Sequence, residues 1–241
     1  MNIVNKLKAK KEDMRGASPV TVVFLGDSVT QGCYEVYRNS PTTIETVFDY
    51  DSAYSTRFKS MVNLLYPNAQ LNIINSGISG DNAVGALARI ERDALNYNPD
   101  LVVVGLALND STAGMEKLYE YRSAMTEIVK RVKNAGAECI LLTPNMMNEY
   151  VSCHIFDDLT KNIAEGCKKV QVEGVLDAYV EVIRDIAKEQ GGKLCDVYAK
   201  WKAMSRAGVD ITDLLSNYIN HPIRKLHYLT AMMLVDTIFE D

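Results

Sequence analysis

The hydrophobic residues of this chain gather in five short runs. Each run holds four to six residues, mostly Val, Ile and Leu, and is too brief for an ordinary helix. They cover residues 20–25, 71–75, 101–106, 139–142 and 194–197. Runs of this kind are typical of parallel strands that are buried on both faces of a sheet. The pattern therefore predicts a central parallel sheet of about five strands.

Between these runs, apolar residues recur at helical spacing. Three stretches each place four large side chains on one helical face. These faces are formed by Tyr54, Phe58, Met61 and Leu65, by Leu118, Met125, Val129 and Val132, and by Val175, Tyr179, Val182 and Ile186. Strands that alternate with helices predict a doubly wound α/β fold, a three-layer α/β/α sandwich of the flavodoxin-like type.

A single domain is predicted over residues 1–241. This length suits one well-buried α/β domain and is short for two, and no linker rich in Pro, Gly or Ser divides it. Residues 1–18 are expected to form a polar helical extension before the first strand. Residues 33–51 form an insert that is long for a strand-to-helix connection. Two interpretations are equally favoured: it lines a substrate pocket, or it packs on its own aromatic residues at the surface.

Composition limits the partners and the compartment. The 31 acidic and 26 basic residues give a net charge of −5, so no nucleic-acid partner is expected. The N-terminal residues lack the apolar stretch of a signal peptide or membrane span, so no membrane partner is expected either. The five cysteines are odd in number and lack zinc-finger spacing. A cytoplasmic location is predicted, with neither a metal nor a cofactor, and the oligomeric state stays open.

Small and polar residues follow three of the predicted strands. Asp27 and Ser28 come after the first strand, Gly80 lies in the turn after the second, and Asn109 follows the third. Ligands of parallel α/β sheets bind beside the carboxyl ends of the strands, so these residues are expected to lie at one edge. Taken singly, the Gly-Asp-Ser segment is more typical of a turn or a helix cap than of a site.

His221 is the candidate base for Ser28. A serine hydroxyl becomes a nucleophile only when a base can take its proton, and His221 stands in a His-Pro pair before the last predicted helix. Taken alone, a histidine beside a helix-opening proline is more often a packing residue. His154 is a rival base of lower rank, and His227, inside the last predicted helix, is expected to be either a packing or an exposed residue.

Together these blocks resemble the GDSL/SGNH hydrolases, a family of GDSL-like lipases, acylhydrolases and esterases. The residues for which the family is named are matched, in order, by Ser28, Gly80, Asn109 and His221, and the resemblance extends from about Val20 to the C-terminus. It implies the SGNH hydrolase fold and a serine esterase with Ser28 as nucleophile and His221 as base. It also implies an oxyanion hole made by the backbone N–H groups of Ser28 and Gly80 and the side-chain amide of Asn109.

The sequence departs from the family pattern in two places. Ala107 stands where many members have a Gly, two residues before the Asn. Tyr218 occupies the position, three residues before His221, where a full triad carries an Asp, and a phenol is a weak acceptor for an imidazole. Two alternatives follow. One is a Ser-His dyad in which a main-chain carbonyl or an Asn side chain orients His221, and the other is an acid from elsewhere, with Asp213 the nearest upstream.

The resemblance implies small acyl esters as substrates, with acetyl groups on carbohydrates as the leading case. Asp27 and Asn145 are predicted to contact the substrate, because Asn145 leaves the fourth predicted strand at the same sheet edge. A non-catalytic carbohydrate-binding or regulatory protein on a hydrolase scaffold is the alternative that Tyr218 suggests. A flavodoxin-like phosphate binder is disfavoured, since no Gly-x-Gly or Gly-Lys-Ser/Thr pattern follows the first strand.

Overall fold

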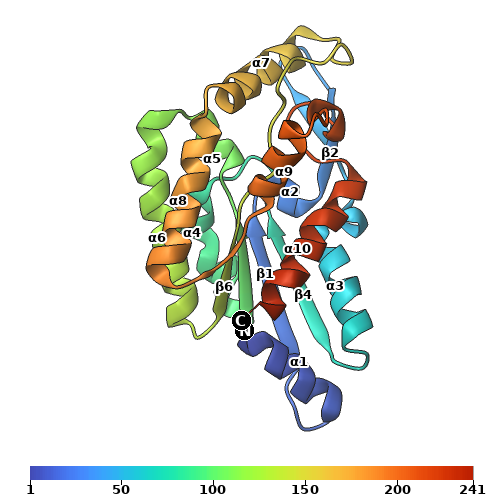
Figure 1. Cartoon of the computed structure of the whole chain (residues 1–241), viewed down its shortest axis with the longest axis vertical. Helices are drawn as coiled ribbons and strands as arrows, with labels where there is room; N and C mark the ends of the chain where they lie inside the picture. The colour runs from blue at the N-terminus through green and yellow to red at the C-terminus, as the bar shows by residue number, and fades with distance from the viewer. Residues whose placement is uncertain (241) are drawn as a thin grey trace.

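Figure 1 shows a central parallel sheet with helices on both faces. The structure is a computed structural model and describes residues 1–240. The strand order is β4 (Leu71–Gly77), β1 (Val20–Gly26), β5 (Leu101–Gly105), β6 (Glu138–Leu142) and β7 (Lys193–Cys195). All neighbouring strands pair in parallel. The predicted three-layer α/β/α sandwich with about five parallel strands is confirmed.

The chain crosses from one side of β1 to the other, and this crossing determines where a ligand can bind. β4 pairs with one edge of β1 and β5 with the other, which is the flavodoxin-like strand order. In such sheets ligands bind at the carboxyl ends of the strands where the winding direction reverses. Here that switch point lies between β1 and β5, the two strands that lead to Ser28 and Asn109.

Helices form the outer two layers (Figure 1). One face is covered by α1 (Asn2–Glu12), α3 (Tyr54–Leu65) and α10 (His227–Phe239), and the other by α4 (Ala83–Asp93), α6 (Leu118–Asn134) and α8 (Val175–Gln190). Four more helices lie outside this regular scheme: α2 (Ser28–Gln31), α5 (Leu108–Thr112), α7 (Asp158–Val172) and α9 (Val197–Arg206). α7 caps the end of the molecule opposite α1, as Figure 1 shows.

The core lies between the sheet and the helices on each face. The apolar side chains of β1 and β5 are buried on both sides of the sheet, as their continuous runs predict. Most side chains of the predicted helical faces are buried or half-buried as well. Leu65 shares a face of α3 with Tyr54 and Phe58, but it is the last residue of the helix and is 47% exposed.

The predicted insert forms a small second sheet. β2 (Cys33–Arg38) and β3 (Ile44–Phe48) pair antiparallel as a hairpin, and a short 3₁₀ turn over Tyr50–Ser52 leads into α3. Tyr34 is fully buried, whereas the outer end of the hairpin is exposed. The hairpin is therefore anchored at its base, beside α2.

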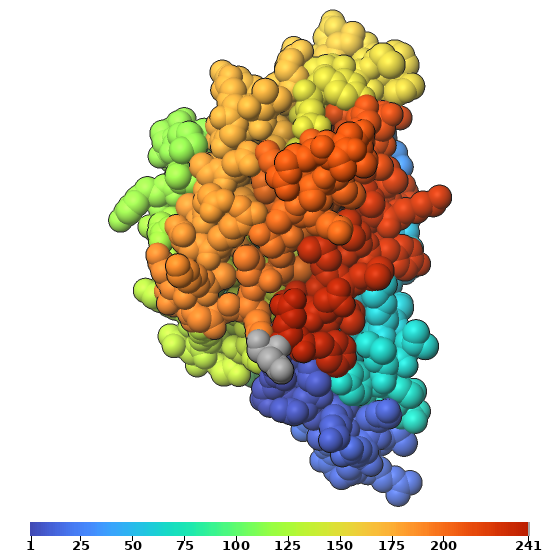
Figure 2. All heavy atoms as spheres, viewed as in Figure 1, coloured from blue at the N-terminus to red at the C-terminus, as the bar shows by residue number. Residues whose placement is uncertain are grey.

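The N-terminal segment packs on the sheet instead of extending freely. Ile3 and Leu7 of α1 are buried, and the carboxylate of Glu138 accepts hydrogen bonds from the backbone of the first turn. Figure 2 shows α1 projecting at one end of the molecule, with α8, α9 and α10 closely covering the face in view. Within residues 1–240, none of the helices combines the length and the apolarity needed to cross a bilayer.

Candidate active site

Ser28 lies at the tight turn between β1 and α2. The Asp27 carboxylate caps α2 by accepting a hydrogen bond from the backbone N–H of Val29 at 2.9 Å. A Cβ atom at Gly26 would lie 2.0 Å from the hydroxyl of Thr30 and 2.7 Å from the Gly105 carbonyl oxygen. Only glycine therefore lets the chain turn this sharply and bring the Ser28 hydroxyl to the end of the strand.

The Ser28 hydroxyl meets the imidazole of His221. Ser28 Oγ lies 3.0 Å from His221 Nε2, although the two residues are 193 positions apart in the sequence. Burial lowers the pKa of His221 to about 4, because a charged imidazolium loses its hydration inside the protein. At neutral pH the ring is uncharged, and its Nε2 can accept the serine proton.

A main-chain carbonyl holds the other nitrogen of His221. Nδ1 lies 2.8 Å from the carbonyl oxygen of Tyr34 on β2. A carbonyl oxygen only accepts hydrogen bonds, so Nδ1 must carry the proton and Nε2 is left free to accept from Ser28. Of the two alternatives that follow from Tyr218, the geometry is that of the carbonyl-oriented dyad.

The candidate acids and the rival histidines lie elsewhere. Asp213 is exposed in the 3₁₀ turn Thr212–Leu214, and no carboxylate within residues 1–240 accepts a hydrogen bond from His221. Tyr218 has a left-handed backbone, φ +57°, and its ring stacks on that of His154. His227 is buried in α10, where Nδ1 accepts the backbone N–H of Tyr54 at 3.1 Å, so of the two expectations for this residue, packing and exposure, the structure shows packing.

The three predicted oxyanion donors come from three adjacent strands that end at one level. Gly26 of β1 is in register with Gly77 of β4 and Gly105 of β5. Two, three and four residues beyond these glycines, respectively, stand Ser28, Gly80 and Asn109. Parallel strands in register deliver such residues to one sheet edge.

Hydrogen-bonding capacity is left over on each of these donors. Within residues 1–240, no protein atom accepts a hydrogen bond from the backbone N–H of Ser28 or Gly80. Asn109 Nδ2 donates to the carbonyl oxygen of Asp81 at 2.8 Å, and this bond orients the amide while leaving its second hydrogen available. Ala107 is buried just before α5. The chain thus offers two backbone donors and one side-chain donor.

Arg89 of α4 fixes the loop that carries Gly80. Its guanidinium donates to the carboxylate of Asp81 at 2.7 Å and to the carbonyl oxygens of Ser76 and Gly26 at 2.8 and 3.0 Å. The side chain is only 9% exposed, and it also pairs with Asp93. One arginine therefore ties the end of β1 to the loop after β4.

Two buried carboxyl groups flank the site. Burial raises the pKa of Asp27 to about 7 and that of Asp110 to about 6. Asp110 Oδ1 accepts the backbone N–H of Ala83 at 2.9 Å, which fixes the start of α4 against α5. Below these pKa values both groups are neutral, so little negative charge opposes an oxyanion beside them.

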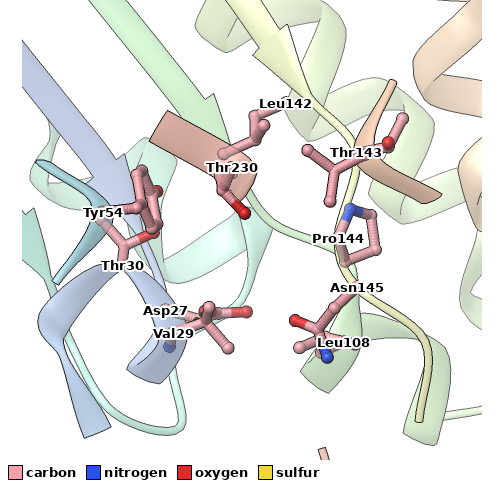
Figure 3. Close-up of a pocket in the computed structure, with 12 residues that line it drawn as sticks. Asp27, Val29, Thr30, Tyr54, Leu108, Leu142, Thr143, Pro144, Asn145 and Thr230 are labelled. Atoms are coloured by element: carbon pink, nitrogen blue, oxygen red, sulfur yellow. Dashed lines mark hydrogen bonds between the residues drawn. The ribbon is translucent and has the colours of Figure 1, made fainter. Parts of the chain in front are cut away.

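Asp27 and Asn145 line a small cavity behind the turn that carries Ser28. In Figure 3 they lie on opposite sides of a space of about 30 Å³ closed by Tyr54, Leu142 and Thr230. This is room for one or two water molecules.

Asn145 braces the loop that carries His221. Its amide donates to the carbonyl oxygens of Met146 and Asn220, at 2.7 and 2.8 Å. The contacts that the structure gives Asp27 and Asn145 are thus to the protein itself, and their contact with substrate stays a prediction.

A groove of about 270 Å³ lies beside Asn109, and the sequence did not indicate it. Its walls come from α4, α5, α6, α8 and the segments next to them, and polar and apolar atoms line it to a similar extent. They include Asn82, Asp110, Lys117, Glu120, Tyr121 and Tyr179. The signal was spread over four helices, so no local motif marks it. The groove borders Asn109, one of the three candidate oxyanion donors, and is wide enough for a small polar ligand.

Comparison with known proteins agrees with this geometry. A family profile described as GDSL-like Lipase/Acylhydrolase matches residues 24–228. An acetylxylan esterase of Geobacillus stearothermophilus is 23% identical over 195 residues, covering 77% of this chain and 80% of the relative. An arylesterase of Vibrio mimicus is 28% identical over 106 residues, 42% of this chain and 52% of that protein.

Solved structures show the same fold. The crystal structure of Axe2, an acetylxylan esterase from Geobacillus stearothermophilus, has a TM-score of 0.68 at 21% identity, and the match covers 93% of this chain and 96% of that one. The acetyl xylan esterase AlAXEase has a TM-score of 0.66 at 19% identity, over 91% of this chain and 100% of its own. The SGNH hydrolase fold is confirmed. The chain belongs to the GDSL-like lipase/acylhydrolase family, and it is a carboxylic ester hydrolase.

Proposed function

We propose that the protein is a serine esterase that removes small acyl groups, acetyl groups on carbohydrates first among them, through a Ser28-His221 centre. The observation that carries the proposal is the hydrogen-bonded series from Ser28 Oγ through His221 to the Tyr34 carbonyl, with distances of 3.0 and 2.8 Å. This series supplies a hydroxyl, a neutral base and a group that selects the base's tautomer.

The reaction then follows from the positions of these groups. His221 Nε2 takes the Ser28 proton as Oγ attacks the ester carbonyl carbon, and a tetrahedral intermediate forms. The Ser28 and Gly80 N–H groups and the Asn109 amide stabilise its negative oxygen. His221 returns the proton to the leaving alcohol, and an acyl group remains on Ser28. Water, activated by the same imidazole, releases the acid and restores the serine.

The proposed substrate class rests on the relatives and on the polarity of the site. An acetylxylan esterase matches most of this chain. The groove beside Asn109 carries Lys117, Glu120 and two tyrosines, which suit the hydroxyl groups of a sugar. The cytoplasmic location is likewise a proposal, supported by five unpaired cysteines within the described residues, four of them buried.

Replacement of Ser28 by alanine tests the catalytic proposal. Loss of the nucleophile removes the acyl-enzyme route, so kcat on p-nitrophenyl acetate and on acetylated xylooligosaccharides should fall by roughly a thousandfold or more in the folded variant. Labelling by a fluorophosphonate probe should disappear with it. Ser60→Ala is the matched control, because Ser60 is an exposed serine of α3 whose hydroxyl bonds only to its own helix. Unchanged turnover in Ser28→Ala would contradict the proposal, and a wild-type protein that is neither labelled nor active would favour a non-catalytic, carbohydrate-binding protein.

A further inference from the structure

The partner of His221 belongs to a peripheral element. The Tyr34 carbonyl lies on the β2–β3 hairpin, which forms its own sheet and pairs with none of the five central strands. A family triad would place a carboxylate three residues from the His, on the same loop. Here the two halves of the hydrogen bond come from segments 187 positions apart. The hydrogen bond therefore forms only if the hairpin is held in a defined position relative to the His221 loop.

Arg224 makes that connection. It lies three residues after His221, and its guanidinium donates from Nη1 and Nη2 to the two carboxylate oxygens of Glu35, at 2.5 and 3.0 Å. Its Nε donates to Asp49 at 2.9 Å. The guanidinium also lies 4.2 Å from the centre of the Tyr34 ring. The base of the hairpin is thus tied to the His221 loop on both of its strands, and the guanidinium also lies over the ring of Tyr34.

The hydrogen bonds of Arg224 are better suited to orienting the Tyr34 carbonyl than to stabilising the folded protein. Glu35 is the residue next to Tyr34, so a bidentate bond to its carboxylate fixes the peptide unit that carries the Tyr34 carbonyl. Asp49 follows β3, and its backbone N–H donates to the Gly32 carbonyl, which closes the base of the hairpin. The Arg224 side chain is 36% exposed, and partly exposed ion pairs contribute little to folding. A planar fork held at three points nevertheless gives a defined geometry.

We propose that Arg224, with Glu35 and Asp49, forms a clamp that positions the Tyr34 carbonyl against His221 Nδ1 and so performs the orienting task of the absent triad aspartate. The three side chains are positioning residues, since none of them touches the reacting atoms. The proposal rests on the proposed Ser28-His221 function for its kinetic consequence. Its structural consequence, the tautomer of His221, can be measured in the resting protein.

Arg224→Lys and Glu35→Gln test the clamp with little change in volume. Lysine keeps the charge of Arg224 but loses the fork, and glutamine keeps the shape of Glu35 but loses the charge. Both variants should lower kcat on p-nitrophenyl acetate on the order of 10- to 100-fold, as expected for a base displaced by about an ångström, while KM changes little. Arg122→Lys is the matched control, because Arg122 also pairs with two acids, Asp185 and Glu189, but between α6 and α8.

Nitrogen-15 NMR of the imidazole rings provides a readout that a merely structural role would not move. The chain has only three histidines, so the His221 signals can be assigned with a His221→Gln variant. Wild type and Arg122→Lys should show the Nδ1-protonated tautomer at neutral pH, and the two clamp variants should show a mixture of tautomers with an unchanged fold by circular dichroism.

The outcomes separate this inference from the proposed function. If the clamp variants keep kcat within twofold of wild type and retain one His221 tautomer, the clamp is rejected while the esterase stands. If kcat falls only in proportion to a loss of folded protein, the clamp is also rejected. A third outcome is that the two clamp variants show the expected mixture of tautomers, while the wild-type protein is neither active nor labelled by a fluorophosphonate. The proposed function then fails and the clamp remains.

Discussion

At the scale of single residues, burial controls the protonation state of the groups around Ser28. The same loss of hydration that lowers the pKa of His221 raises the pKa values of Asp27 and Asp110. All three groups are pushed toward their uncharged forms. At neutral pH the base is therefore uncharged and ready, whereas Asp110 is still mostly ionised and Asp27 partly so, and both carboxyl groups become neutral only as the pH falls below about 6.

The pH dependence of activity should reveal the low pKa of His221. The reaction needs a neutral imidazole, so kcat/KM should not be lost as the pH is lowered from about 8 to about 5, and it should fall as the pH passes through about 4, where His221 becomes protonated. Turnover of p-nitrophenyl acetate across this range measures it. Recovery of full activity on return to pH 7 controls for acid unfolding, and an acid limb near pH 6.5 would contradict the assignment.

Asp27 should make folding less favourable as the pH rises. Its pKa in the folded protein, about 7, lies above the value of 3.8 for an ordinary Asp. Between these values the unfolded chain has released a proton that the folded protein keeps, so stability is lost with rising pH, by about 4 kcal/mol in all. Asp27→Asn retains the oxygen that caps α2 and should remove most of this loss.

Denaturant unfolding of both proteins at several pH values between 4 and 8 measures that difference. The variant should gain stability over wild type as the pH increases. Asp213→Asn, which alters an exposed carboxylate, is the matched control. Parallel stability curves for wild type and Asp27→Asn would show that Asp27 ionises normally.

At the scale of secondary-structure elements, the site depends on segments being held in register by side chains from outside the sheet. Arg89 binds the end of β1 and the loop after β4, and Arg224 binds the hairpin to the His221 loop. Both arginines donate to several acceptors at once, which a lysine cannot do in the same planar geometry. The candidate catalytic residues Ser28 and Gly80 are small, and the long side chains of these two arginines hold the segments around the site in place.

Arg89→Met should destabilise the protein and weaken the oxyanion donors together. Methionine fills a similar volume but leaves the carboxylates of Asp81 and Asp93 without their buried partner, which should cost about 3–5 kcal/mol of the free energy of unfolding. Urea unfolding measures the stability change, and kcat of the remaining folded fraction should also be reduced. Arg131→Met, whose ion pairs lie on the exposed side of α6, should change neither quantity greatly. Equal stability of both variants would contradict the role given to Arg89.

The central strands and the main helices could be predicted from the sequence, but the β2–β3 hairpin and its contacts could not. The five strands follow from their apolar runs, and Ser28, Gly80, Asn109 and His221 could be found because each belongs to a short motif. The Tyr34 carbonyl could not be found in this way, since every residue has a carbonyl and nothing in the side chain tells where it points. Arg224 and Arg89 carry no motif either, because their partners lie far away in the sequence. The missing Asp at Tyr218 did indicate that some other group must orient His221.

At the scale of the whole molecule, the parallel sheet gathers these parts at one edge and leaves limited space beside them. The cavity behind Asp27 holds about 30 Å³, and the groove beside Asn109 holds about 270 Å³ and is lined by polar and apolar atoms to a similar extent. Neither offers an apolar tunnel. A long alkyl chain would therefore remain partly in water at this edge of the sheet.

Activity should accordingly peak at short acyl chains. Each methylene gains about 0.8 kcal/mol only when it enters apolar surroundings. The cavity behind Asp27 is too small for more than the first carbons, and polar side chains interrupt the apolar surface of the groove beside Asn109. Across p-nitrophenyl esters from acetate to dodecanoate, kcat/KM should be greatest for acetate or butyrate and lower by the eight-carbon ester. A value that continues to rise with chain length would contradict the short-acyl proposal and favour a lipase or thioesterase.

The use of a backbone carbonyl as the partner of His221 changes which kinds of genetic variation the site tolerates. Any amino acid at position 34 supplies the same carbonyl, so evolution can replace that side chain without deleting the acceptor. Carbonyls on a strand alternate in direction from one residue to the next. Deleting one residue between Gly32 and Tyr34 would consequently turn a carbonyl away from His221. A point mutation at position 34 thus leaves the acceptor in place, whereas an insertion or deletion nearby can remove it. In a triad that relies on an aspartate, a single point mutation is enough to remove the acceptor.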